Sequence, residues 1–88
     1  VHFDQAFLGV TGYHPSTGFS CGISDEAFLK QTAIRQSEKV VALMDSSKIN
    51  VKCSFSFGTL SDVDIIVSDG KLPEEFLLEC KRYGVEVL

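Results

Sequence analysis

Two short apolar runs rich in β-branched residues, each followed by a carboxylate, place the tightest constraint on the fold of this chain. Residues 40–44 form the first run and directly precede Asp45, and residues 63–67 form the second, with Asp69 two positions later. Runs of this kind are typical of strands that are buried on both faces of a parallel sheet. The carboxylates then follow the carboxyl ends of two such strands.

Two segments are predicted to be helical. The first runs from Ser24, which can cap a helix, to about Ser37, and acidic residues in its first turn complement the helix dipole. Its apolar residues spread around more than one face, so we expect this helix to contact two neighbouring elements. The second helix starts at Pro73 and ends near Gly84, because proline suits a first helical turn and glycine a helix end.

The remaining segments complete an alternating order of elements. Residues 5–10 and 85–88 are interpreted as strands, residues 53–57 as a short half-buried strand, and the glycine-bearing residues 11–22 as a loop. The order is strand, helix, strand, short strand, strand, helix, strand. It predicts an α/β fold, a Rossmann-like and mostly parallel sheet flanked by helices. The 88 residues fit one small domain or part of one.

Polar residues follow the predicted strands where α/β proteins bind ligands. Ligands bind beyond the carboxyl ends of such strands, so residues 11–18, 45–48 and 69–70 should lie along one edge. The string Asp45-Ser46-Ser47-Lys48 is the most informative, because a carboxylate, two hydroxyls and an ammonium can bind both the hydroxyls and the anion of a sugar phosphate. The alternative is a polar turn in which Asp45 or Ser46 caps the next segment.

Three further residues are candidates for the same site. Glu26 can accept hydrogen bonds from sugar hydroxyls or act as a general base, although carboxylates in a first turn usually complement the dipole. Lys30 lies one turn later and can pair with Glu26, a pairing that is most often found on the surface. Gly12 belongs to the glycine-bearing loop, whose composition suits a close approach of backbone to ligand.

Composition excludes several other kinds of partner. The net charge of −4 argues against nucleic acid, and the chain alone is expected not to bind duplex DNA specifically. Three dispersed cysteines indicate neither zinc nor disulfides, and suggest reduced thiols in a cytoplasmic protein. No cofactor is expected without a dinucleotide motif or P-loop, and no membrane contact without a long apolar stretch. Since the chain opens on Val1, we expect a soluble fragment of a longer protein.

Seven blocks carry a resemblance when they are taken in order. They are Asp4-Gln5-Ala6-Phe7-Leu8-Gly9-Val10, Gly12, Gly18, Asp25-Glu26-Ala27, Lys30, Asp45-Ser46-Ser47-Lys48 and Ile65-Ile66-Val67-Ser68-Asp69. In this order and spacing the chain resembles the C-terminal effector-sensing domain of DeoR-type bacterial repressors of sugar metabolism. The most specific part is the apolar strand ending in D-S-S-K, followed by a second strand ending in S-D.

The resemblance implies that residues 1–88 are the later part of a larger sensor domain. The parent would carry an N-terminal winged helix-turn-helix, absent here, through which alone it contacts DNA. The sensor would be related in fold to ribose-5-phosphate isomerase, bind a phosphorylated sugar and form homo-oligomers. The ligand-binding residues would be Gly12, Glu26, Lys30, Asp45, Ser46, Ser47, Lys48 and Asp69.

The chain also resembles the sugar-phosphate isomerases that share this fold. Asp4, Glu26 and residues 45–48 resemble the isomerases' Asp-containing strand end, their helix-opening Glu and their D-x-S-K string. Thr11 and Tyr13 replace the acidic residues that isomerases place after the first strand, which argues for binding without turnover.

Two other function classes stay open. A fragment of a phosphosugar isomerase or deaminase would be distinguished by the lack of a helix-turn-helix upstream in the full-length gene. An assembly module would use the broad apolar helix and several phenylalanines as a subunit interface, a role that is compatible with sensing.

Overall fold

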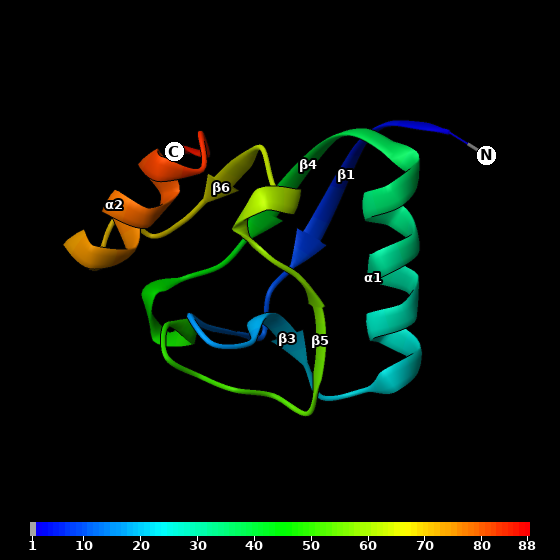
Figure 1. Ribbon diagram of the computed structural model, residues 1–88, viewed down its shortest axis with the longest axis horizontal. Helices are drawn as coiled ribbons and strands as arrows, with labels where there is room; N and C mark the ends of the chain where they lie inside the picture. Colours follow the sequence, from blue (N-terminus) through cyan, green and yellow to red (C-terminus); the bar gives the residue numbers. More distant parts are fainter. Residues whose placement is uncertain (1) are drawn as a thin grey trace.

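The computed structural model describes residues 2–88, which form two sheets and two helices (Figure 1). The larger sheet has the strand order β1-β4-β6-β7 and consists of β1 (Phe3–Gly9), β4 (Ser37–Leu43), β6 (Ile65–Val67) and β7 (Glu86–Val87). The smaller sheet consists of β2 (Gly12–His14), β3 (Gly18–Cys21) and β5 (Phe55–Gly58). The helices are α1 (Ser24–Gln36) and α2 (Glu74–Arg82), and two 3-10 turns are η1 (Ser46–Lys48) and η2 (Leu60–Asp62).

The larger sheet is parallel throughout, which confirms the predicted arrangement of the apolar runs. Its register sets Ala6 beside Val40, and Leu8 beside Ala42, which in turn pairs with Ile66. Because side chains alternate between the faces of a strand, these five residues share one face. All five belong to the hydrophobic core.

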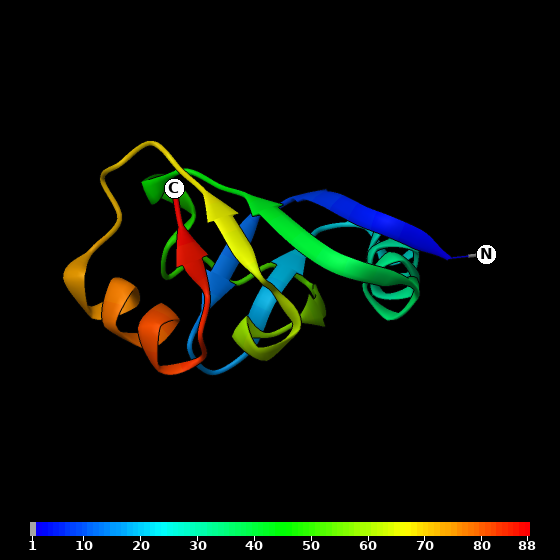
Figure 2. The same ribbon diagram turned by 90° about the horizontal axis from the view of Figure 1, so that it is seen from above.

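The opposite face of this sheet carries several exposed apolar side chains. Both helices and the smaller sheet lie on one side of the larger sheet (Figure 2). We call the other side the bare apolar face, formed by Phe7, Val41, Leu43, Ile65 and Val67. Phe7 is 63% exposed and Leu43 and Val67 are also exposed, whereas Val41 between them is only 4% exposed. The predicted burial of the two apolar runs on both faces is therefore wrong for Leu43 in the first run and for Val67 in the second.

The prediction of a loop at residues 11–22 is wrong, because this segment contains the hairpin of β2 and β3. These strands pair antiparallel, with the turn closed by the Thr17 amide donating to the His14 carbonyl over 3.1 Å. Gly18 has a φ of +76°, and a Cβ there would lie 2.3 Å from the Gly58 carbonyl oxygen, so only glycine fits. All four residues of β3 are buried, so no alternation was present to indicate a strand.

The short strand predicted near residues 53–57 is confirmed as β5, but in another sheet. It pairs antiparallel with β3 and not with the parallel strands. The smaller sheet and α2 are joined by aromatic contacts, in which Tyr13 lies 5.1 Å from Phe19 and 4.9 Å from Phe76 between ring centroids. Phe57 lies 6.2 Å from Phe19. The core of the domain therefore lies between the two sheets and α2.

Both helices are confirmed, with one difference at the start of α1. Ser24 was predicted to cap this helix, but it lies inside the first turn, and Ile23 is the N-cap without a side-chain hydrogen bond. The helix contacts β1, β3, β4 and β5, which confirms that it serves two neighbouring layers. The second helix follows Pro73, and Gly84 after it has a φ of +73°.

Candidate functional site

The loops after three parallel strands leave the same edge of the larger sheet. Backbone hydrogen bonds extend the pairing past the strand ends, since the Val10 amide donates to Leu43 over 3.0 Å and the Met44 amide to Val67 over 3.1 Å. The segments that begin at Val10, Asp45 and Ser68 are therefore neighbours along this edge, as the parallel topology predicted.

The ends of β4 and β6 are joined by a cluster of hydroxyls and carboxylates. The Ser46 hydroxyl donates to Asp69 Oδ2 over 2.9 Å, and the Ser46 amide donates to the same oxygen over 3.2 Å. The Ser47 amide donates to Asp45 Oδ1 over 2.9 Å, and the Ser47 hydroxyl bonds the same oxygen. Asp45 is thus also the N-cap of η1, as the polar-turn alternative predicted. We call these four residues the edge cluster.

The two carboxylates of the edge cluster have lowered pKa values. Hydrogen bonds from Ser47 hold the pKa of Asp45 below its ordinary 3.8, and amide donors from Lys71 and Ser46 do the same for Asp69. Since both pKa values are lower in the folded than in the unfolded chain, this contribution to stability is present above about pH 4 and is lost as the pH falls further. At neutral pH both groups are ionised acceptors, suited to hydroxyls and not to a phosphate.

Replacing Ser47 by alanine is expected to raise the pKa of Asp45, because the largest cause of its depression is the Ser47 hydroxyl. Carboxyl-carbon NMR titration measures this value directly. Ser46→Ala serves as the matched control, since it removes a donor to Asp69. Equal titration of Asp45 in the wild type and in Ser47→Ala would contradict the assignment.

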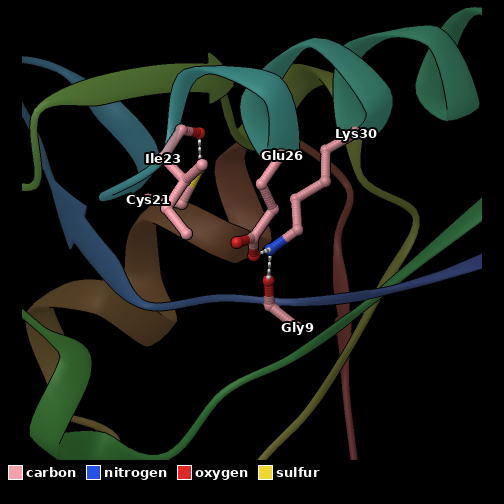
Figure 3. Close-up of polar contacts among 5 residues, drawn as sticks. All are labelled: Gly9, Cys21, Ile23, Glu26 and Lys30. Carbon is pink, nitrogen blue, oxygen red and sulfur yellow. Dashed lines mark hydrogen bonds and ion pairs between the residues drawn. The ribbon is translucent and has the colours of Figure 1, made fainter.

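Lys30 and Glu26 meet the end of the neighbouring strand β1. Lys30 Nζ lies 2.9 Å from Glu26 Oε1 and donates to the Gly9 carbonyl oxygen over 2.5 Å (Figure 3). The same ammonium lies 5.0 Å from the centre of the Phe57 ring, and the Lys30 side chain is 13% exposed. The predicted pair of Glu26 and Lys30 is therefore confirmed, but it is more than a surface pair, because Lys30 also joins α1 to both sheets.

The other predicted residues occupy different surroundings. Lys48 ends η1 beside the edge cluster and is half-buried. Gly12 is buried, and a Cβ there would lie 2.6 Å from the Val51 carbonyl oxygen, so close packing under the segment after η1 requires this glycine. Asp4, likened to a strand-end residue of the isomerases, lies at the start of β1, away from the carboxyl edge.

Sequence reasoning missed two partners of Lys30. The Gly9 carbonyl and the Phe57 ring come from strands far from α1 in the sequence, and nothing in their local residue pattern indicates the contact. Among residues 2–88 there is no group of three or more His, Cys, Asp or Glu side chains suited to a metal ion. Neither α1 nor α2 has the length and apolar character of a membrane-crossing helix.

The fold and this edge define a class of protein. Carboxylates, hydroxyls and an ammonium at the carboxyl edge of a parallel sheet are the arrangement of a small-ligand-binding α/β domain. Residues 1–70 match the sequence profile of the family described as the DeoR C terminal sensor domain. The chain belongs to this family.

Similar proteins are transcriptional regulators by name. The uncharacterized HTH-type transcriptional regulator FruR of Bacillus subtilis is 39% identical over 78% of this chain and 28% of its own length. The putative aga operon transcriptional repressor of Escherichia coli O157:H7 is 32% identical over 99% of the chain and 32% of its own length. The HTH-type transcriptional regulator GlpR of Haloferax volcanii is 30% identical over 100% of this chain and 34% of its own length. The chain thus spans about a third of the length of these relatives.

Proposed function

We propose that residues 1–88 are the later part of a sensor domain that binds a phosphorylated sugar and regulates a repressor of sugar metabolism. The observation that carries this proposal is the edge cluster with Lys48 beside it, which combines acceptors for hydroxyls and a cation for an anion. Relatives named as transcriptional regulators, one of them as a putative repressor of the aga operon, support the regulatory part.

Each polar residue has a distinct proposed role. Asp45 and Asp69 accept hydrogen bonds from sugar hydroxyls, and the Ser46 and Ser47 hydroxyls complete this contact. Lys48 binds the phosphate, because the ionised carboxylates beside it repel an anion. Glu26 accepts a further hydroxyl at the end of β1. Lys30 contributes by fixing Glu26, since its ammonium is already engaged by Glu26 and Gly9.

The bare apolar face supports the proposal that the sensor domain is larger than this chain. Strands of parallel sheets are ordinarily covered on both faces, and water disfavours the exposed Phe7 and Leu43 side chains. We propose that the rest of the sensor domain covers this face in the parent protein, and that a separate domain contacts DNA.

The isolated 88-residue chain is accordingly expected to self-associate through the bare apolar face. The double variant Phe7→Ser/Leu43→Ser should shift the chain toward monomer, as measured by sedimentation velocity over a concentration series. Phe28→Ser is the matched control, because Phe28 is equally exposed but lies on α1. Sedimentation of the wild-type chain as a monomer at every concentration would count against this expectation.

Titration calorimetry on the full-length regulator tests the proposed function. Phosphorylated sugars should bind measurably, and the same sugars without phosphate should bind at least about tenfold more weakly, because they lose a charge-assisted contact. The bound phosphosugar should also change the affinity for operator DNA and should be recovered unchanged. Equal binding of both sugar forms, or conversion of the sugar to an isomer, would contradict the proposal.

A further inference from the structure

A cavity of about 390 Å³ lies beside α2, apart from the edge cluster. Its walls come from α2, the hairpin and the segment after η1, and the side chains that matter here are Tyr13, Asn50, Glu75, Phe76, Glu79 and Tyr83. Neither the edge cluster nor Glu26, Lys30 and Lys48 contribute to these walls. The volume is in the range of small-molecule sites, about 300–1,000 Å³.

The charged residues that line the cavity are all acidic. Glu75 and Glu79 line it one helical turn apart, and its walls contain no lysine, arginine or histidine. Glu79 pairs with Arg82 over 2.9 Å, whereas Glu75 forms no ion pair within residues 2–88. Like charges at this spacing repel one another, and a cation placed between them relieves the repulsion.

A polar group with no protein partner also reaches this cavity. Tyr13 is only 7% exposed, with its ring packed against Phe19 and Phe76. Its hydroxyl forms no hydrogen bond with any other residue among 2–88. Every fully buried side-chain N or O atom in these residues has a hydrogen-bond partner, so the Tyr13 hydroxyl is not fully buried. The hydroxyl is therefore accessible to a small molecule, and Tyr13 is one of the residues that line the cavity. Burial, with a contribution from Glu79, raises the pKa of Tyr13, so the group keeps its proton.

We propose that this cavity binds a small organic cation, an ammonium or guanidinium ion on a compact and partly apolar body. The carboxylates of Glu75 and Glu79 bind the charge, and the Tyr13 hydroxyl bonds a polar atom of the ligand. The rings of Phe76 and Tyr83 contact its apolar part, and aromatic rings also attract cations. This is a second ligand, chemically opposite to the anionic effector proposed for the sheet edge.

Butylguanidine and its neutral isostere butylurea test the proposal by NMR titration of the full-length regulator. Saturable shifts of Tyr13, Asn50 and Phe76 are expected with butylguanidine, with millimolar or tighter affinity. Butylurea should bind at least about tenfold more weakly, because it has nearly the same shape but lacks the positive charge and carries a carbonyl acceptor in place of one N–H donor group. Absence of saturable shifts, or equal binding of the two probes, would overturn the proposal.

Variants of three glutamates on α2 distinguish binding in the cavity from a general effect of negative charge. Glu75→Gln and Glu79→Gln are each expected to weaken butylguanidine binding about three- to tenfold. Glu74→Gln should leave it unchanged, because Glu74 lies on the same helix but outside the cavity. Equal effects of Glu74→Gln and Glu75→Gln would refute the site. Binding of N-acetyl-arginine amide more than about tenfold tighter than butylguanidine would show that a polypeptide side chain is the occupant, which also overturns a small-molecule site.

Discussion

Replacing Phe19 by alanine is expected to lower the free energy of unfolding by about 3–5 kcal/mol. The Phe19 side chain is fully buried on β3, and its ring packs between those of Tyr13 and Phe57. Deleting it leaves a cavity where both sheets meet the core, and close-packed interiors relax only partly around such a loss. A domain of this size has a total stability of only about 4–13 kcal/mol, so the variant should lose a large share of its stability.

Urea unfolding followed by circular dichroism measures this loss. Phe28→Ala is the matched control, because Phe28 is largely exposed on α1 and should change stability by less than about 0.5 kcal/mol. The smaller sheet would have no part in the core if Phe19→Ala and Phe28→Ala had the same midpoint.

Lys48→Met is expected to weaken phosphosugar binding by the full-length regulator about ten- to a hundredfold. Lys48 ends η1 at the carboxyl edge, where the ionised Asp45 and Asp69 cannot hold an anion. A charge-assisted contact to phosphate contributes about 1.5–3 kcal/mol, and methionine keeps much of the side-chain stem without the charge. If the effector is an inducer, the variant should stay on its operator at effector concentrations that release the wild type.

Calorimetric titration compares this variant with Lys81→Met. Lys81 is an exposed lysine of α2 and does not belong to the edge cluster, so its replacement should leave the affinity unchanged. Unchanged affinity in Lys48→Met, with the wild type binding normally, would show that Lys48 is only a turn residue. Unchanged thermal unfolding of both variants establishes that the fold is intact.

The parallel sheet was predictable because its signals are local. The β-branched runs at 40–44 and 63–67 form β4 and β6, and Pro73 and Gly84 bracket α2. The hairpin was not predictable in the same way, since β3 is buried along its whole length and its glycine-rich neighbourhood has the composition of a loop. One local signal was overlooked, the capping box from Thr59 to Asp62 that starts η2.

The placement of the candidate site residues was predictable, but their contacts were not. The position of residues 45–48 and Asp69 after parallel strands put them on one edge, as topology requires. The bond from Ser46 to Asp69 joins two loops and follows from that placement. The contacts of Lys30 with Gly9 and Phe57 depend on how α1 packs between two sheets, which residue spacing alone does not determine.

The direct connection between α1 and β4 bears on which sugar stereoisomers the proposed site would bind. The helix ends at Gln36 and the strand begins at Ser37, so no flexible residue separates them. Glu26 lies in the first turn of that helix and Asp45 follows the end of that strand, so one unbroken length of regular backbone fixes the spacing between them. If these residues bind the effector as proposed, their site is preorganised and gives up little conformational entropy on binding. It should therefore favour stereoisomers whose hydroxyls already match this spacing, and discriminate against epimers that would need the backbone to move.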